Sequence, residues 1–426
     1  MITVGLDFGT HQTKICVEEK NGSETHYRFH MFRDLKGNMQ YTLPSIICIT
    51  PDEKIKYGYI DKQTEGCYKR YFKQTVFRDV NSSDMKLWEA ACYSTWYLAY
   101  ILFDLEEKYG QAFTVQMGTP SDTSRLDSRK AIAVSVLASA YKLVEDVFHN
   151  DKNAFLDTPI SKLIDLTDIV RYSEILKKQY GILVFPESYA CLMPIVGRGK
   201  IAHGMNIIVD IGGGTTDISF FTIEEKVIKS KVYHPQVYDF FSINKGLNYL
   251  VKQDVTTGDA LTKGLHIIKG SEIDKDRASQ YYKDIENICN IIKENLKREW
   301  TAQTIHNKEK LLKALKNRPI IYTGGGSTID ILRRTYGGFQ EIHTIDYDSW
   351  KSKEFDSKDI FSNKAMCPIL STAYGLSISV ATDAIERKPF RDIFKDRRND
   401  EPEDNNREFG KALRGFDYGT DWDAWK

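Results

Sequence analysis

The residues best suited to chemistry are two aspartates, each at the end of an apolar strand and followed by a glycine turn. One turn spans residues 7–14 and the other spans residues 210–217. Glycine lets the backbone approach a phosphate closely, and consecutive backbone N–H groups form a nest for anions. An aspartate at the strand end can hold water on Mg²⁺. One such turn is common among ordinary β-turns, but two copies favour phosphate binding.

A third glycine turn, residues 323–328, lies between an expected strand and an expected helix. There it could contact a nucleoside, because a helix N-terminus accepts negative or polar groups. Neither the Walker pattern nor the dinucleotide-binding fingerprint fits any of the three turns.

Hydrophobic periodicity places these turns in two similar halves of the chain. In the first half we expect strands at residues 2–7, 14–19, 25–31, 45–50, 54–59 and 113–117, helices at 85–109 and 128–146, and two short helices within 151–178. In the second half we expect strands at 205–210, 217–223, 227–233 and 319–322, and helices at 274–301, 328–335 and 369–382. This weak repetition predicts two related lobes around a cleft.

The composition fits a globular protein whose net charge gives no reason to expect binding to a charged polymer such as nucleic acid. The chain has 426 residues, 41% hydrophobic and 28% charged, which is long enough for two lobes. Because 59 basic residues balance 59 acidic ones, we expect neither nucleic acid nor an anionic membrane as a partner. The chain lacks a bilayer-length apolar run and a basic signal region, so we expect a cytoplasmic protein. Its seven cysteines show no CxxC spacing, which favours reduced core thiols.

Together the motifs resemble the actin/Hsp70/sugar-kinase ATPase superfamily, and within it the Hsp70 nucleotide-binding domain. The three turns have the order and spacing of two phosphate motifs and one adenosine motif, and residues 186–190 and 371–375 are similar to the two connecting helices. Residues 41–45, 83–88 and 117–120 are further Hsp70-like stretches. The resemblance covers about residues 1–385 and implies an α/β fold with two RNase H-like domains around a nucleotide cleft.

This resemblance also implies domain boundaries. Lobe I is expected at residues 1–187, with an inserted subdomain at about 39–112, and lobe II at 188–385, with an insertion at about 230–305. Residues 386–426 are then a charged connector and an aromatic tail. Tyr418, Trp422 and Trp425 in that tail either anchor a protein partner or fold back onto their own lobe.

The same resemblance implies a site for ATP, ADP and Mg²⁺. Asp7 and Asp210 would orient hydrated Mg²⁺, and Glu187 would orient or deprotonate the attacking water, joined by Lys69. Lys73 competes with Lys69 for this role, and Asp217 is expected to support the second turn. The expected nucleotide contacts are Gly9, Thr10, His11, Lys14, Gly212, Gly213, Gly214, Thr215, Lys293, Lys297, Gly324, Gly325, Gly326 and Ser327. For His11, a solvent-facing position is an equal alternative.

Three departures from Hsp70 are visible in the motifs. Lys14, seven residues after Asp7, is more typical of actin, plasmid-segregation actins and sugar kinases. Ile329 occupies the position at which Hsp70 has an arginine that packs on the adenine ring. Ile369 occupies the position in the second connecting helix at which Hsp70 usually has an acidic residue. We therefore expect the adenine contacts to differ most from those of the family.

These features support more than one function. The leading hypothesis is an Hsp70-like ATPase without its own substrate domain, acting as a nucleotide-switched chaperone-related or regulatory subunit. The alternative is a bacterial actin-like ATPase that self-assembles into filaments, which Lys14 favours. A small-molecule kinase would need a distinct base and substrate pocket. A binding-only protein is disfavoured because Asp7, Glu187 and Asp210 are all present.

Overall fold

The computed structural model of the protein contains two large β-sheets with one strand topology. It describes residues 1–77, 85–196, 201, 204–227, 231–252, 268–302, 318–346, 350, 364–385 and 387–394. In each sheet three successive strands pair antiparallel, and two later strands extend the sheet in parallel beyond the first strand. This repetition confirms the predicted two-lobed, actin-like α/β fold, with one RNase H-like half in each lobe.

The register of the two sheets places their aspartates at equivalent positions. Lobe I contains β1 (Ile2–Asp7), β2 (Gln12–Asn21), β3 (Glu24–Phe29), β10 (Phe113–Thr119) and β11 (Ile182–Pro186), in the order β11-β10-β1-β2-β3. Lobe II contains β12 (Gly204–Ile211), β13 (Thr216–Val227), β14 (Lys231–Ile243), β15 (Pro319–Thr323) and β16 (Glu341–Thr344), in the order β14-β13-β12-β15-β16. Asp7 lies opposite Lys14, and Asp210 lies opposite Asp217. The two glycine turns therefore leave matching ends of matching strands.

Lobe I is packed around two long helices. These are α2 (Leu87–Tyr109) and α3 (Leu126–Lys142), the latter continued by one π-helical turn, Leu143–Val147. Trp96 and Tyr97 of α2 are nearly inaccessible to solvent and belong to one continuous apolar core with β1 and β10. The smaller elements of this lobe are β4 (Phe32–Arg33), β5 (Met39–Gln40), β6 (Leu43–Pro44), β7 (Ile47–Ile49), β8 (Ile55–Tyr57), β9 (Cys67–Lys69), α1 (Phe72–Val76), α4 (Lys152–Asp157), α5 (Ile160–Leu166) and α6 (Glu174–Gln179).

Lobe II rests on one long amphipathic helix, α11 (Lys275–Ala302). Its apolar residues recur with helical spacing, so they form one stripe that packs into the lobe II core. The stripe consists of Tyr281, Ile285, Cys289, Ile292 and Leu296, all fully buried. A short helix, α8 (Leu247–Leu250), packs beside it and supports the second glycine turn.

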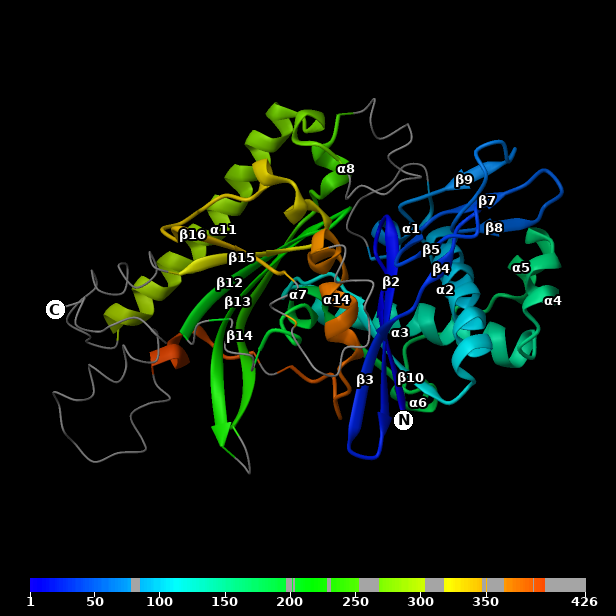
Figure 1. The fold of residues 1–426 in the computed structure, drawn as a ribbon, viewed down its shortest axis with the longest axis horizontal. Coiled ribbons are helices and arrows are strands. Elements are labelled where there is room, and N and C mark those ends of the chain that lie inside the picture. The colour runs from blue at the N-terminus through cyan, green and yellow to red at the C-terminus, as the bar shows by residue number, and fades with distance from the viewer. Residues whose placement is uncertain are drawn as a thin grey trace.

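Two helices connect the lobes at the centre of the molecule (Figure 1). They are α7 (Glu187–Ala190) and α14 (Cys367–Ser377), which pack against each other. α14 also covers β1, β2 and β10 of lobe I, although the chain reaches it from lobe II. A β-carbon on Gly375 would come within 1.7 Å of the Ala190 carbonyl oxygen, so only glycine permits this close crossing.

Several elements differ from those predicted. The segment 328–335, expected as a helix, contains the 3₁₀ turn Asp330–Leu332 and only the last residue of another, Gly325–Thr328. Three short helices replace the two expected in 151–178, and strands β11 and β16 were not predicted. α14 ends at Ser377, five residues before the expected helix end at 382. These segments are short, so packing rather than local propensity decides their conformation.

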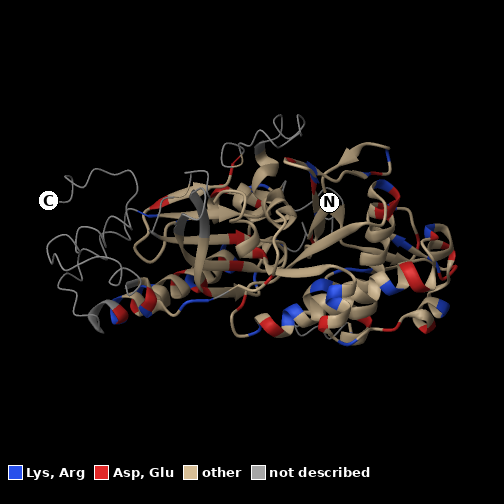
Figure 2. Ribbon diagram, turned by 90° about the horizontal axis from the view of Figure 1, so that it is seen from below, with Lys and Arg blue, Asp and Glu red and all other residues tan. Residues whose placement is uncertain are grey.

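Charged residues of both signs are interspersed on the helices of the two lobes (Figure 2). Among the residues that the structure describes, no helix combines the length and the apolar character needed to cross a bilayer. The expected tail anchors, Tyr418, Trp422 and Trp425, lie outside the described residues, as does most of the charged connector.

Candidate functional site

The ends of the two glycine turns meet in a small cavity between the lobes. Its volume is about 70 Å³, below the about 300–1,000 Å³ of typical ligand sites. The lining residues come from both lobes and both connecting helices. They are Asp7, Gly9, Thr10, His11, Gln12, Lys14, Lys73, Glu187, Asp210, Gly212, Gly213, Gly214, Thr215, Asp217, Leu247, Gly324, Gly325, Ile369 and Thr372. The structure thus shows a cleft in a closed form.

The first turn joins β1 to β2 and is held by its own lobe. The Ser45 hydroxyl donates to the Gly9 carbonyl oxygen at 2.7 Å, and the Ser45 backbone N–H donates to the His11 carbonyl oxygen at 2.9 Å. Across the strand pair, Lys14 Nζ donates to Asp7 Oδ2 at 2.9 Å. Lys14 therefore brings a positive charge to the aspartate that ends β1.

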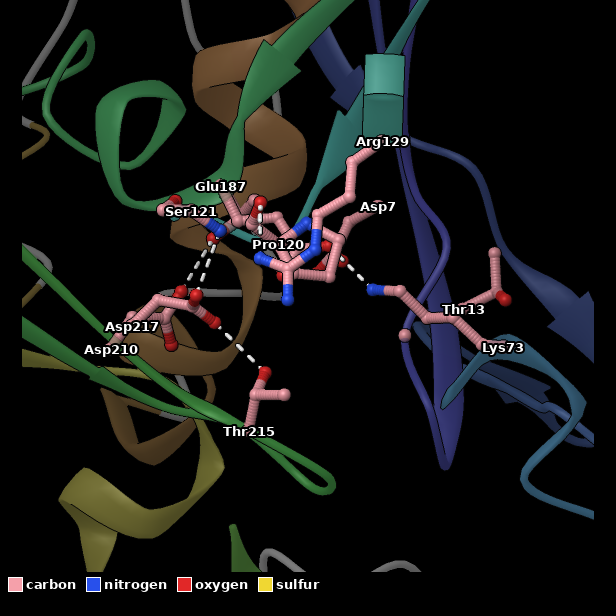
Figure 3. A network of polar contacts seen from close by, with 12 residues as sticks. Asp7, Thr13, Lys73, Pro120, Ser121, Arg129, Glu187, Asp210, Thr215 and Asp217 are labelled. Atoms are coloured by element: carbon pink, nitrogen blue, oxygen red, sulfur yellow. Dashed lines mark hydrogen bonds and ion pairs between the residues drawn. The ribbon is translucent and has the colours of Figure 1, made fainter. Parts of the chain in front are cut away.

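The second turn joins β12 to β13 and has an acid where the first has a lysine. Asp217 accepts hydrogen bonds from the Thr215 hydroxyl and from the Ser121 backbone N–H, each at 2.8 Å (Figure 3). The backbone N–H groups of Leu247 and Asn248 in α8 donate to the Gly212 and Gly213 carbonyl oxygens at 3.0 and 2.9 Å. Asp217 thus supports the turn and joins it to lobe I through Ser121.

The two turns touch each other across the cleft. A β-carbon on Gly213 would lie 2.1 Å from His11 Cδ2, and one on Gly214 would lie 2.6 Å from Thr10 Oγ1. Only glycine allows this approach. His11 also packs edge-on against the Tyr71 ring, and its Nε2 atom is buried with no hydrogen-bond partner in the described part of the chain. Burial and the nearby Arg70 guanidinium lower the pKa of His11 to about 3, so its imidazole is neutral.

The lysine beside Glu187 is Lys73, and not Lys69. Lys73 Nζ donates to Glu187 Oε1 at 2.5 Å, and both side chains are almost completely buried. Lys69 lies on β9, half-buried, with its Nζ 5.8 Å from the centre of the Tyr93 ring, and it does not line the cleft. Tyr71 takes a left-handed backbone conformation with φ 61° before α1, and this turn directs Lys73 inward.

The acids of the cleft strongly perturb one another. Burial, opposed by the Lys73 ammonium and aided by the Asp7 carboxylate, raises the pKa of Glu187 to about 7. Burial and the Glu187 carboxylate raise the pKa of Asp210 well above its usual range. Burial also raises the pKa of Asp217 to about 6. Such shifts cluster at functional sites, because charge and desolvation are concentrated there.

One side chain of lobe I bridges the second turn and α8. Gln74, the neighbour of Lys73 on α1, is almost fully buried. Its Nε2 donates to the Gly214 carbonyl oxygen at 3.1 Å, and its Oε1 accepts from Asn248 Nδ2 at 3.1 Å. Together with the contact between His11 and Gly213, this Gln74 bridge joins the two lobes beside the second turn.

The third turn contributes less of its length than expected. Gly324 and Gly325 line the cleft, whereas Gly326 and Ser327 do not, and Ser327 instead donates to the Gly324 carbonyl oxygen at 2.7 Å. Lys293 and Lys297 lie on α11 outside the lining, and Lys297 pairs with Glu294 at 2.5 Å. The expected adenine contacts of the two lysines are therefore not brought to the cleft in this closed form.

The charge of the cleft fits a bound cation. Four buried or nearly buried acids, Asp7, Glu187, Asp210 and Asp217, share the lining with only two ammonium groups. Within the described residues, no group of three or more His, Cys, Asp or Glu side chains could hold a metal by itself. Carboxylate oxygens such as those of Asp7 and Asp210 are ligands that Mg²⁺ accepts beside retained water and phosphate oxygens.

Some lining residues were not predicted. Gln12, Leu247 and Thr372 are examples, and the Gln74 bridge behind the lining was also missed. Thr372 lies within the Ser-Thr-Ala-Tyr-Gly stretch of α14, and its hydroxyl donates to Asp210 Oδ2 at 3.4 Å. The spacing of the connecting motif could have indicated Thr372, whereas nothing local marks Gln74.

Comparison with known proteins gives a distant structural similarity. No protein-family model matches the chain, and no curated protein matches it. Among solved structures it is similar to one described as the MamK double helical filament, with a TM-score of 0.45 and 14% sequence identity. That comparison covers 88% of this chain and 97% of the other. At this distance the functional interpretation depends on the geometry of the cleft.

Proposed function

We propose that the protein binds Mg·ATP between its lobes and hydrolyses it to ADP and phosphate. The observation that carries this proposal is the buried pair of Lys73 and Glu187, 2.5 Å apart, between two glycine turns that each begin at an aspartate. Phosphoryl transfer to water depends mainly on positioning and on neutralising charge. The cleft has groups for both tasks.

The residues would divide the work as follows. Asp7 and Asp210 hold the hydrated Mg²⁺, which supplies positive charge to the phosphate oxygens. Lys14 and the two turns hold the phosphates. Glu187 uses one carboxylate oxygen to accept a proton from the attacking water, while Lys73 fixes the other. A base with a pKa near the working pH suits this role.

For the biological role, our favoured proposal is nucleotide-dependent self-assembly of the kind that actin-like proteins undergo. Lys14 supports it, because this lysine lies in the cleft paired with Asp7, and a lysine at this spacing is more typical of actin-like proteins than of Hsp70. An Hsp70-like regulatory switch is the second candidate. The Lys73–Glu187 pair favours it, because the resemblance to Hsp70 implies such a lysine and glutamate.

Sedimentation, with phosphate release measured in the same samples, tests both the proposed hydrolysis of ATP and the proposed biological role. The purified chain is spun with Mg·ATP, with Mg·ADP and without nucleotide, together with Glu187→Ala and Asp210→Ala. Pelleting that requires ATP and reverses as phosphate appears supports self-assembly, and slow phosphate release from a protein that stays in solution supports the switch. Near-normal turnover in both variants refutes the assigned site.

A further inference from the structure

Glu187, the proposed base, begins a helix that lacks a cap of its own. The residue that precedes α7 is Pro186, whose side chain cannot accept a hydrogen bond. The first N–H groups of a helix have no partner within it, and a polar side chain usually accepts from one of them. Here the Ser121 hydroxyl accepts from the Ser188 backbone N–H at 3.0 Å. A serine just beyond the end of β10 therefore takes the place of the missing cap.

The same serine joins α7 to the second glycine turn. The Ser121 backbone N–H donates to Asp217 Oδ1, and the Thr215 hydroxyl donates to Asp217 Oδ2, each at 2.8 Å (Figure 3). Three hydrogen bonds in sequence thus connect the backbone beside Glu187 with a hydroxyl group that lines the cleft. A hydroxyl has a single proton to donate. A phosphate oxygen that accepts the Thr215 proton therefore takes it from the network that holds the start of α7.

A second contact holds the same end of α7 against the same strand of lobe II. The Ser188 and Ser219 hydroxyl oxygens lie 2.5 Å apart. Ser219 follows Asp217 by two residues on β13, so both side chains lie on one face of that strand. Because buried hydrogen bonds are costly to break, these contacts fix the start of α7 relative to β13. The side chains of this network are all buried, namely Thr215, Asp217, Ser121, Ser188 and Ser219.

The side chain of Glu187 is held by lobe I. Lys73 Nζ donates to its Oε1 atom, and Gly118 on β10 lies directly beside it. A β-carbon on Gly118 would come within 2.9 Å of Glu187 Cγ and 3.4 Å of Glu187 Oε1. β10 therefore supplies the space beside the carboxylate, and the residues just after β10 supply the cap of its helix. The carboxylate is fixed through its side chain by one lobe and through its backbone by the other.

We propose that Ser121 is a positioning residue for Glu187 and links the base to the second glycine turn. This inference rests on the proposed hydrolysis of ATP. Without the Ser121 hydroxyl, the Ser188 N–H loses its partner and the start of α7 is free to shift. The carboxylate of Glu187 then moves relative to the attacking water, and a misplacement of about 1 Å costs up to about 10²-fold in rate. Ser121 does not line the cleft, so the affinity for nucleotide stays the same.

Ser121→Ala tests this role, with Ser139→Ala as the matched control. Ser139 on α3 is equally buried, and its hydroxyl also accepts a backbone N–H, that of Val170, at 2.9 Å. Ser121→Ala should lower the single-turnover rate of hydrolysis about 10- to 100-fold and leave the affinity for a non-hydrolysable ATP analogue within about twofold. Ser139→Ala should lose comparable thermal stability but keep the wild-type rate.

A double variant separates positioning of the base from general damage to the cleft. In the Glu187→Ala background, Ser121→Ala should cause no further loss of the residual rate, because residues that act as a unit are not additive. Gly118→Ala crowds the same carboxylate from β10 and should also lower the rate without weakening the ATP analogue.

Three results would overturn the inference while leaving the proposed hydrolysis intact. They are a wild-type rate in Ser121→Ala, an equal loss of rate in Ser139→Ala, and a further loss when Ser121→Ala is added to Glu187→Ala. A wild-type chain that binds the ATP analogue but does not hydrolyse ATP would instead refute the proposed function, and this inference with it. Circular dichroism verifies the fold. If Ser121→Ala does not fold, Ser121→Cys replaces it, and its weaker acceptor should give a smaller loss in the same direction.

Discussion

Single residues give the cleft more buried acidic side chains than basic ones. Asp7 and Asp210 end equivalent strands, but Lys14 lies opposite the first and Asp217 opposite the second. The two backbones are therefore related by pseudo-symmetry, but the equivalent side chains differ in charge: a lysine in the first turn and an aspartate in the second. Lys73 compensates part of the negative charge through its contact with Glu187.

The first prediction separates Lys73 from Lys69. Lys73→Ala should lower the rate of phosphate release about 10²–10³-fold, comparable to the loss of one positioned group in other active sites. Lys69→Ala is the matched control and should stay near the wild-type rate, because Lys69 lies beside Tyr93 outside the cleft. Single-turnover hydrolysis measures the difference, with circular dichroism as the folding control. A larger loss in the Lys69 variant would reverse the assignment.

The second prediction concerns pH. Glu187 acts as a base only when deprotonated, and its pKa is raised to about 7. The rate constant of the chemical step should therefore rise as pH increases through about 7 and then level off. Bound Mg²⁺ adds positive charge and moves the midpoint lower.

Single-turnover rates across this pH range test the prediction, and the affinity for a non-hydrolysable analogue, measured in parallel, separates effects on binding. A rate independent of pH between about 5.5 and 8.5 would contradict the role of Glu187.

Much of the site can be predicted from the sequence because its residues lie in local motifs. Asp7 ends β1, and Gly9 and Thr10 come directly after it, so neighbours in the chain fix their positions in the first turn. The choice between Lys69 and Lys73 is different. It depends on the left-handed conformation of Tyr71 and on the packing of α1, which no local pattern specifies.

At the level of elements, α1 and α8 are joined across the cleft by the Gln74 bridge. Gln74→Ala removes both of its side-chain hydrogen bonds and should speed ADP release several-fold, since each such bond contributes only modestly. Release of a fluorescent ADP analogue, chased with unlabelled ADP, measures this rate.

Asn248→Ala removes one half of the bridge and should have a smaller effect. The double variant should then show non-additive effects, because the two side chains contact each other. Strict additivity would show that the bridge does not restrain opening.

The crossing of α7 and α14 gives the fourth prediction. Gly375→Ala should destabilise the protein by about 1–3 kcal/mol, despite the better helix propensity of alanine, because the added methyl group meets a backbone carbonyl. Gly270→Ala is the control, since its β-carbon would only come within 3.7 Å of Ile331 Cγ2. Urea denaturation measures both, and equal stability of the two variants would contradict the argument.

Long periodic elements follow from the sequence, and short ones do not. The apolar stripe of α11 and the aromatic-rich segment of α2, which contains no Gly or Pro, predict both helices to within a few residues. By contrast, residues 328–335 form no α-helix: one 3₁₀ turn ends at Thr328, and a second covers only Asp330–Leu332. The strand β16 has only four residues, and its pairing with β15 rather than its own pattern defines it.

For the whole molecule, the closed cleft makes nucleotide entry depend on opening. A cavity of about 70 Å³ does not accommodate ATP. The observed rate of binding should therefore reach a plateau as the ATP concentration rises, at the rate of lobe opening. Stopped-flow fluorescence with a labelled ATP analogue measures this, and Gln74→Ala should raise the plateau. A rate that stays linear in concentration would mean that the cleft is open in solution.

The contact between Gly375 and Ala190 has a mechanical consequence. Two helices packed this closely at their crossing can rotate about it but cannot slide past each other. A small change in the spacing of the two glycine turns would then rotate one lobe about this crossing. The displacement of an atom in that rotation increases with its distance from the crossing. The outer rims of the lobes would sweep furthest (Figure 1). A partner or a second copy of the chain that binds those outer rims would respond more strongly to opening or closing of the cleft than a partner bound next to the cleft.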